Sequence, residues 1–137
     1  MKDNLVLALG WIRKADSDLA AARRTIESEG PYDTACFHAQ QAVEKCLKSC
    51  LAFHGQPIPR SHDLEELARL CFDVDEIPEL RAISLEELSG YAVEMRYDPE
   101  FWPSKETAEE AFAVAERVRR LIADRLPSGP GKGDSEP

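Results

Sequence analysis

Apolar residues recur at alternating steps of three and four along the first part of the chain, and this spacing restricts the fold more than any other feature. Seven residues keep to it: Leu5, Ala8, Ile12, Ala15, Leu19, Ala22 and Ile26. Residues spaced in this way lie on one face of an α-helix, which Gly30 and Pro31 then end. No segment shows the strict alternation typical of a half-buried strand. We therefore predict an all-α fold.

The second predicted helix covers about residues 33–54 and ends before a segment rich in glycine and proline, which cannot continue it. Its predicted core-facing residues are Cys36, Val43 and Cys50. A short third helix follows, for which Ser61 or Asp63 can supply the N-terminal cap. Ser104 can cap the last helix in the same way.

A fourth helix is predicted between the third and the last. Pro78 can occupy its first turn, and it must end near Asp98 because Pro99 disfavours helix in the residue before it. Its predicted core-facing residues are Leu80, Ile83, Leu88, Tyr91 and Met95. Together these segments predict an up-and-down bundle of four to five helices.

The chain of 137 residues is long enough for one hydrophobic core. We assign residues 1–126 to one helical domain and residues 127–137, which hold no apolar side chain, to a disordered tail. No apolar run reaches the roughly 18 residues of a membrane span. The first apolar run resembles the core of a signal peptide, but Arg13 and Lys14 stand where a cleavage site would need small residues. We expect a cytoplasmic protein without membrane contact.

The four cysteines are interpreted as buried thiols. Cys46 and Cys50 stand four positions apart on a helix, among apolar neighbours. Neither these two nor Cys36 and Cys71 show the short loop spacing of a Cys-x-x-Cys metal site. We therefore expect no metal site and no cofactor, and free thiols fit a reducing compartment.

A polar stripe on the second helix is the first candidate for binding. At roughly 100° per residue, His38, Gln41, Lys45 and Lys48 fall within about 80° of one another and are predicted to point away from the core. Two ammonium groups, an imidazole and an amide in a row suit a phosphate. The alternative is a solvated helix face on which Glu44 pairs with Lys48. The net charge of −9 argues against broad nucleic-acid binding but not against a local basic patch.

A second candidate segment surrounds Arg96, at the C-terminal end of the fourth predicted helix. There Arg96 can bind an anion, complement the helix dipole or pair with Asp98, and Tyr97 lies beside it. His62 precedes the third helix and is either a loop residue bonded to backbone or a further ligand-binding side chain. Gln40 falls at the edge of the apolar face, where a buried amide needs a partner on a neighbouring helix or at an interface.

Four pieces of sequence carry a more specific signal. They are ADSDLAAA at 15–22, FHAQQAVEKCLK at 37–48, SHDL at 61–64 and RYDP at 96–99. In this order they resemble the HEPN domains of prokaryotes, and the second piece is the specific one. The resemblance covers about residues 10–125. It implies a helical bundle that commonly dimerises and is often encoded beside a minimal nucleotidyltransferase, in many cases as a toxin–antitoxin pair.

Some members of that family are metal-independent ribonucleases with an R-x4–6-H motif, and this sequence departs from the motif. Its histidines, His38, His54 and His62, have no arginine five to seven positions before them. After Arg96, the positions that would hold the histidine are Phe101, Trp102 and Pro103. The tyrosine that follows this histidine in members modified by their transferase is also missing. The resemblance therefore identifies no catalytic residues.

The leading hypothesis is a non-catalytic HEPN protein that binds a nucleotide, an RNA end or a nucleotidyltransferase partner. We expect the phosphate of a bound ligand near Lys45 and Arg96, with His62 and Tyr97 close enough to contribute. In a bundle, the middle of one helix and the end of its neighbour can face a shared groove.

Two alternatives stay open. One is a divergent ribonuclease in which His62 or His38 replaces the missing histidine. The other is a purely structural homodimer that uses its long first helix as the interaction surface. A homodimer is also expected from the resemblance, and because Gln40, Phe101 and Trp102 have no obvious use within one chain.

Overall fold

The computed structural model describes residues 3–127, and the regular structure in that range is entirely helical. Its helices are α1 (Asn4–Glu27), α2 (Asp33–Phe53), α3 (Leu64–Val74), α4 (Pro78–Arg81), α5 (Glu86–Tyr97) and α6 (Lys105–Ala123). The predicted all-α bundle is confirmed. The predicted tail falls almost entirely on residues 128–137, which lie outside the described part of the chain.

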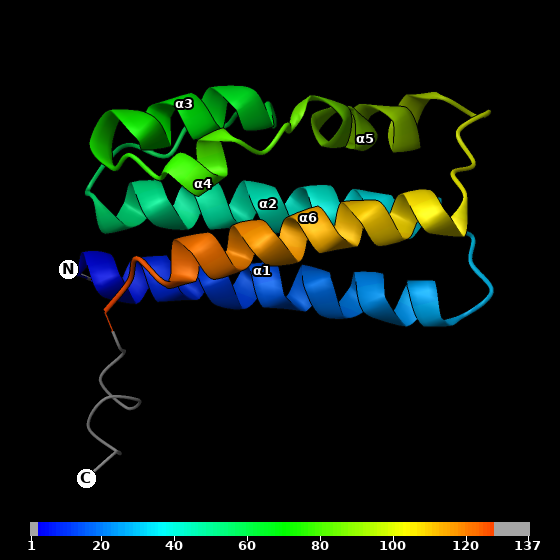
Figure 1. Ribbon diagram of the computed structural model, residues 1–137, viewed down its shortest axis with the longest axis horizontal. Coiled ribbons are helices and arrows are strands. Elements are labelled where there is room, and N and C mark those ends of the chain that lie inside the picture. Colours follow the sequence, from blue (N-terminus) through cyan, green and yellow to red (C-terminus); the bar gives the residue numbers. More distant parts are fainter. Residues whose placement is uncertain (1–2, 128–137) are drawn as a thin grey trace, which may run out of the picture.

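Helix α2 occupies the centre of the bundle (Figure 1). It runs antiparallel to α1 over nearly the whole length of the molecule, and α6 packs against both. Helices α3 and α5 cover α2 from the side opposite α1. Because neighbours surround it, most residues of α2 are buried, including polar ones. The predicted core-facing set of Cys36, Val43 and Cys50 is confirmed.

Side chains cap three of the helices at their N-termini. Asp3 accepts a hydrogen bond from the backbone of Val6 at the start of α1. Asp63 caps α3 and Ser104 caps α6, as the sequence predicts. Each cap satisfies backbone N–H groups that have no partner within the helix, and so fixes where the helix begins.

The predicted fourth helix is interrupted. It divides into the single turn α4 and the longer α5, separated by residues 82–85. Leu80, Leu85 and Leu88 are all buried, at most 5% exposed. In one continuous helix the first two would project about 140° apart, so the break lets all three reach the core. Within residues 3–127, no helix is both long and apolar enough to cross a membrane.

Candidate functional site

Two buried carboxylates organise the polar residues of the bundle. Asp18 on α1 is 8% exposed and Glu44 on α2 is 3% exposed. Each interacts with one lysine and one histidine. We call the group that surrounds them the polar cluster: Asp18, His38, Gln40, Gln41, Glu44, Lys45, Lys48 and His62. It contains five of the seven binding residues predicted from the sequence.

The Asp18 half of the cluster joins α1 to α2. One carboxylate oxygen lies 2.7 Å from Nδ1 of His38, and the other accepts a hydrogen bond of 2.6 Å from Nζ of Lys45. Burial by itself raises the pKa of Asp18, but the hydrogen bonds from His38 and Lys45 outweigh it and hold the pKa below its ordinary value. Asp18 therefore stays ionised inside the bundle.

The Glu44 half joins α2 to the segment before α3. Lys48 Nζ donates to Oε2 over 2.9 Å, and His62 Nδ1 lies 2.9 Å from Oε1. Burial also raises the pKa of Glu44, and the hydrogen bonds from His62 and Lys48 again lower it below the ordinary value. The predicted Glu44–Lys48 pair is present, but its two side chains are only 4% and 10% exposed, so it is not a solvated surface pair.

Gln40 is fully buried and finds its partners within the chain. Its amide nitrogen donates to the backbone oxygen of His62 at 3.3 Å, and its amide oxygen accepts from Gln41 at 2.7 Å. These bonds attach α2 to the chain before α3. Gln40 therefore gives no reason to expect a second protomer.

The charges of the polar cluster cancel while both imidazoles are neutral, because two carboxylates face two ammonium groups. In both histidines Nδ1 is engaged by a carboxylate. No hydrogen bond to Nε2 of either ring is found in the described part of the chain. A neutral imidazole that donates from Nδ1 presents a lone pair at Nε2, whereas a protonated one presents a second donor. Protonation therefore turns a neutral cluster into a positively charged one.

The prediction that the stripe on α2 points out of the core is wrong for Lys48, which is 8% exposed. His38, Gln41 and Lys45 are only partly exposed. The angular spacing is as predicted, but α1 and the segment before α3 cover this face of α2. Burial is tolerated because Asp18 and Glu44 neutralise the ammonium groups there.

Arg96 and Tyr97 lie apart from this network, in the last turn of α5. Both are exposed, Tyr97 to 74%. Neither side chain forms a hydrogen bond or ion pair with any of residues 3–127. Asp98, the possible partner of Arg96, instead accepts a hydrogen bond from the backbone of Glu100. Arg96 is thus a free cation within the described structure.

An open hollow on α1 adjoins the polar cluster. It has a volume of about 620 Å³, and its lining includes Leu7, Trp11, Arg13 and Lys14. The Trp11 ring connects it to the cluster, because Lys48 Nζ lies 5.6 Å from the ring centroid. An aromatic ring thus stands next to two surface cations and to the charged groups of α2.

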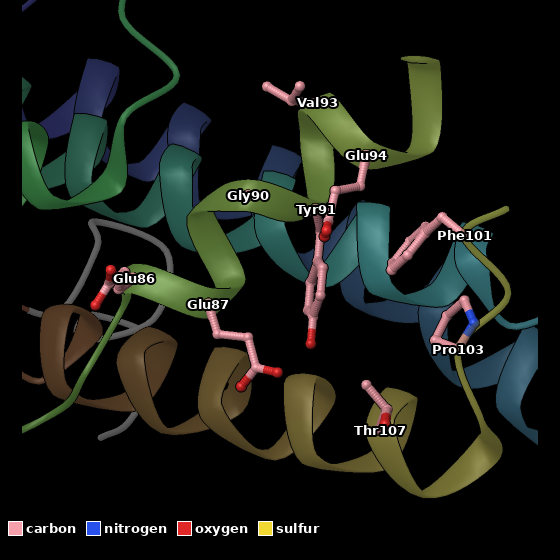
Figure 2. Close-up of a pocket in the computed structure, with 9 residues that line it drawn as sticks. All are labelled: Glu86, Glu87, Gly90, Tyr91, Val93, Glu94, Phe101, Pro103 and Thr107. Atoms are coloured by element: carbon pink, nitrogen blue, oxygen red, sulfur yellow. The ribbon is translucent and has the colours of Figure 1, made fainter. Parts of the chain in front are cut away.

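A second pocket, of about 550 Å³, lies between α5 and α6 (Figure 2). Tyr91 and Phe101 stand on one side of it, with their ring centroids 5.6 Å apart. Its lining also carries the carboxylates of Glu86, Glu87 and Glu94. Three negative charges disfavour a phosphate here, so an anion site belongs elsewhere. Phe101 packs against the core and is accounted for within one chain, whereas Trp102 is 66% exposed.

Sequence reasoning missed two residues of this region, Asp18 and Trp11. Asp18 stands one turn from both Ala15 and Ala22, which are core residues, so its position beside the apolar face was a visible signal. The proximity of Trp11 to Lys48 depends on how α1 and α2 pack, which the spacing of residues along one helix does not show.

Comparison with known proteins identifies the family of this chain. The HEPN domain model matches residues 8–126. The chain is similar to the crystal structure of TT1696 from Thermus thermophilus, with a TM-score of 0.73, 30% identity, and coverage of 87% of this chain and 98% of that one. It is also similar to the crystal structure of ST0689, an archaeal HEPN homologue, with a TM-score of 0.69, 25% identity, and coverage of 93% and 100%. A search of curated proteins gave no match. With the family model spanning α1 to α6, this chain belongs to the HEPN domain family.

Proposed function

We propose that this HEPN protein binds the phosphate of a nucleotide or an RNA end without cleaving it, and acts with a minimal nucleotidyltransferase. The observation that carries the proposal is the polar cluster beside the Trp11 hollow. Its basic side chains are held in place by buried carboxylates, yet those of Lys45, His38 and His62 keep 23%, 29% and 56% of their surface exposed. Donors fixed in advance lose little freedom when an anion binds.

The chemistry of the two lysines leaves room for such an anion. An ammonium group has three donors, and the bonds to Asp18 and Glu44 use one donor on each lysine. The imidazoles add donors at Nε2 once they are protonated. Trp11 offers a face on which a base can stack, and Arg13 and Lys14 stand beside it. Arg96 lies apart from these groups, so we propose it, with Tyr97 next to it, as a further contact for the part of a ligand that extends beyond the cluster.

Cleavage is the second candidate, and one observation favours it. A carboxylate that holds Nδ1 of a histidine while Nε2 is left available is the arrangement that orients a general base. His38 and His62 both have it. We rank this candidate lower because the R-x4–6-H motif of the known ribonucleases is absent. RNA incubated with the protein and EDTA tests it: cleavage that is lost in both His38→Gln and His62→Gln would establish the activity.

Binding is tested by titrating ATP and a 5′-phosphorylated oligoribonucleotide into the protein. His62→Gln and Arg96→Ala should each weaken binding roughly tenfold to a hundredfold, the value of one charge-assisted hydrogen bond. Arg117→Ala is the control, because Arg117 is exposed on α6 and outside the cluster and the hollow.

The outcomes of that titration separate the possibilities. If His62→Gln and Arg96→Ala both bind as the wild type does, the phosphate site proposed here is wrong. If only Arg96→Ala binds as the wild type does, the ligand occupies the cluster and Arg96 has no part in it.

The partnership with a nucleotidyltransferase, and with it a toxin–antitoxin role, rests on the family resemblance. Exposed Trp102 and Tyr97 at the end of α5 are the aromatic residues that we propose for contacts with a partner or a second protomer. Co-expression with a nucleotidyltransferase encoded beside the gene should give a complex on gel filtration, and Trp102→Ala should weaken it. Two proteins that elute separately at tens of micromolar would contradict this part of the proposal.

A further inference from the structure

The ends of α2 and α3 bring together four side chains that the proposed function does not use. Cys50 and His54 stand four positions apart in the last turn of α2 and at its C-cap. Cys71 and Asp75 have the same spacing at the end of α3. Side chains four apart on a helix project to the same side. Two adjacent helix ends therefore each present a pair of groups that can bind a metal.

Three of these side chains converge. The Cys50 sulfur, a ring nitrogen of His54 and a carboxylate oxygen of Asp75 all lie within 4.8 Å of one another. The Nε2 of His54 is 3.5 Å from Oδ2 of Asp75. For a tetrahedral zinc ion with bonds of about 2.0–2.3 Å, neighbouring ligand atoms are about 3.3–3.6 Å apart. The His54–Asp75 distance fits that separation, and the sulfur, which lies within 4.8 Å of both atoms, has to move closer to bind the same ion.

We propose that Cys50, His54 and Asp75 form a binding site for Zn²⁺. A thiolate, an imidazole and a carboxylate are the three kinds of side chain that bind zinc in proteins. The thiolate and the carboxylate together carry the two negative charges that balance the ion. With three protein ligands, a water molecule takes the fourth position.

The surroundings suit an ion that arrives from solvent. Cys50 is buried at 3% exposure, whereas the side chains of His54 and Asp75 are 28% and 18% exposed. The sulfur therefore forms the floor of the site, and the other two ligands stand at its mouth. Arg125 pairs with the other oxygen of Asp75: its Nη1 lies 3.6 Å from Oδ1, while Oδ2 faces His54. An outer partner of this kind orients a carboxylate ligand.

Cys71 is assigned a supporting place rather than that of a ligand. Its thiol donates to the backbone oxygen of Leu47 over 3.3 Å, and its sulfur is not among the three that converge. Cys50 is therefore the cysteine of the pair whose sulfur lies with His54 and Asp75.

The test uses the full chain without an affinity tag, reduced and then freed of metal with a chelator. We expect one equivalent of Zn²⁺ to bind per chain by calorimetry. Co²⁺, used as a probe in the same site, should give the thiolate-to-cobalt charge-transfer absorption and the visible bands of a tetrahedral ion. Cys50→Ala should abolish the charge-transfer absorption. Mutating a residue that only hydrogen-bonds to a metal ligand typically weakens metal binding about 10- to 100-fold. Because His54 and Asp75 are proposed as ligands themselves, His54→Ala and Asp75→Asn should each weaken Zn²⁺ binding by at least that much.

Cys46→Ala is the matched control, because Cys46 is a buried cysteine one turn earlier on the same helix. It should bind Zn²⁺ and Co²⁺ as the wild type does, and circular dichroism should show that every variant remains helical. Equal Zn²⁺ affinity in the wild type, Cys50→Ala and His54→Ala would overturn the proposal, as would Co²⁺ bound without a thiolate band. Neither result bears on phosphate binding, because Cys50, His54 and Asp75 are not part of the polar cluster.

Discussion

Replacing Lys45 with methionine removes one ammonium group from the interior and leaves most of the aliphatic chain in place. In the wild type that group lies 2.6 Å from a carboxylate oxygen of Asp18, whose side chain is 10% exposed. In the variant Asp18 keeps only His38 as a partner. An ionised carboxylate would then stay buried with half of its compensation.

The cost follows from that burial. Removing one partner of a buried ion pair typically costs about 3–5 kcal/mol. Here the lysine side chain is 23% exposed and His38 remains, so we expect a loss of about 2–3 kcal/mol in the free energy of unfolding. For a chain of this size that corresponds to a fall of about 6–12 °C in Tm. Lys45 therefore cannot be removed without loss of stability, whether or not it binds a phosphate.

Urea unfolding and thermal melting followed by circular dichroism measure the effect. Arg117→Met is the control, because Arg117 is exposed on α6, and it should change the free energy of unfolding by no more than about 0.5 kcal/mol. The double variant Asp18→Asn with Lys45→Met should recover part of the loss, since no unpaired charge remains buried. A Lys45→Met variant that melts within about 2 °C of the wild type would refute the reasoning.

Three more predictions follow from the same contacts. The pKa values of Asp18 and Glu44 are lowered in the folded state, so their contribution to stability is complete above their ordinary values, near 3.8 and 4.5, and is lost as the pH falls below these toward the lowered values. Urea unfolding followed from pH 7 down to pH 2 should show the loss, and a flat profile would contradict it. Burial raises the pKa of Cys36 and of Cys46 to about 12, so both should resist alkylation at pH 8 until urea unfolds the chain, and rapid labelling of the native protein would show that this core opens readily. Light scattering should give a mass near twice 15.3 kDa, which Trp102→Ala should reduce; a mass of one chain at tens of micromolar would remove the homodimer.

The helices were predictable from sequence because each carries its own periodic and terminal signals. Spacing along α1 and α2 indicated which faces are buried, and Asp63 and Ser104 marked where α3 and α6 begin. The interruption between α4 and α5 was not predictable in this way. It arises because Leu80 and Leu85 must both reach one core, a requirement that exists only once α6 and α3 are in place.

The sequence predicted that the candidate binding residues lie together on α2, but not that buried carboxylates pair with them. An angular plot places His38, Lys45 and Lys48 together, yet it cannot show that Asp18 on another helix bonds to the first two of them. The zinc site illustrates the same limit. Cys50 and His54 show a four-residue spacing in the sequence, whereas Asp75 joins them only through the packing of α3 on α2.

These contacts also bear on the stretch FHAQQAVEKCLK, which carries the family resemblance. Within it, His38 and Lys45 attach α2 to α1, while Gln40 and Glu44 attach α2 to the segment before α3. Its polar residues therefore stabilise the fold whether or not they contact a ligand, and loss of function on mutation there does not by itself identify a binding residue. A variant at these positions informs on binding only when its free energy of unfolding is known. His62 offers the cleaner test, because its imidazole is 56% exposed and Glu44 still pairs with Lys48 when His62 is replaced.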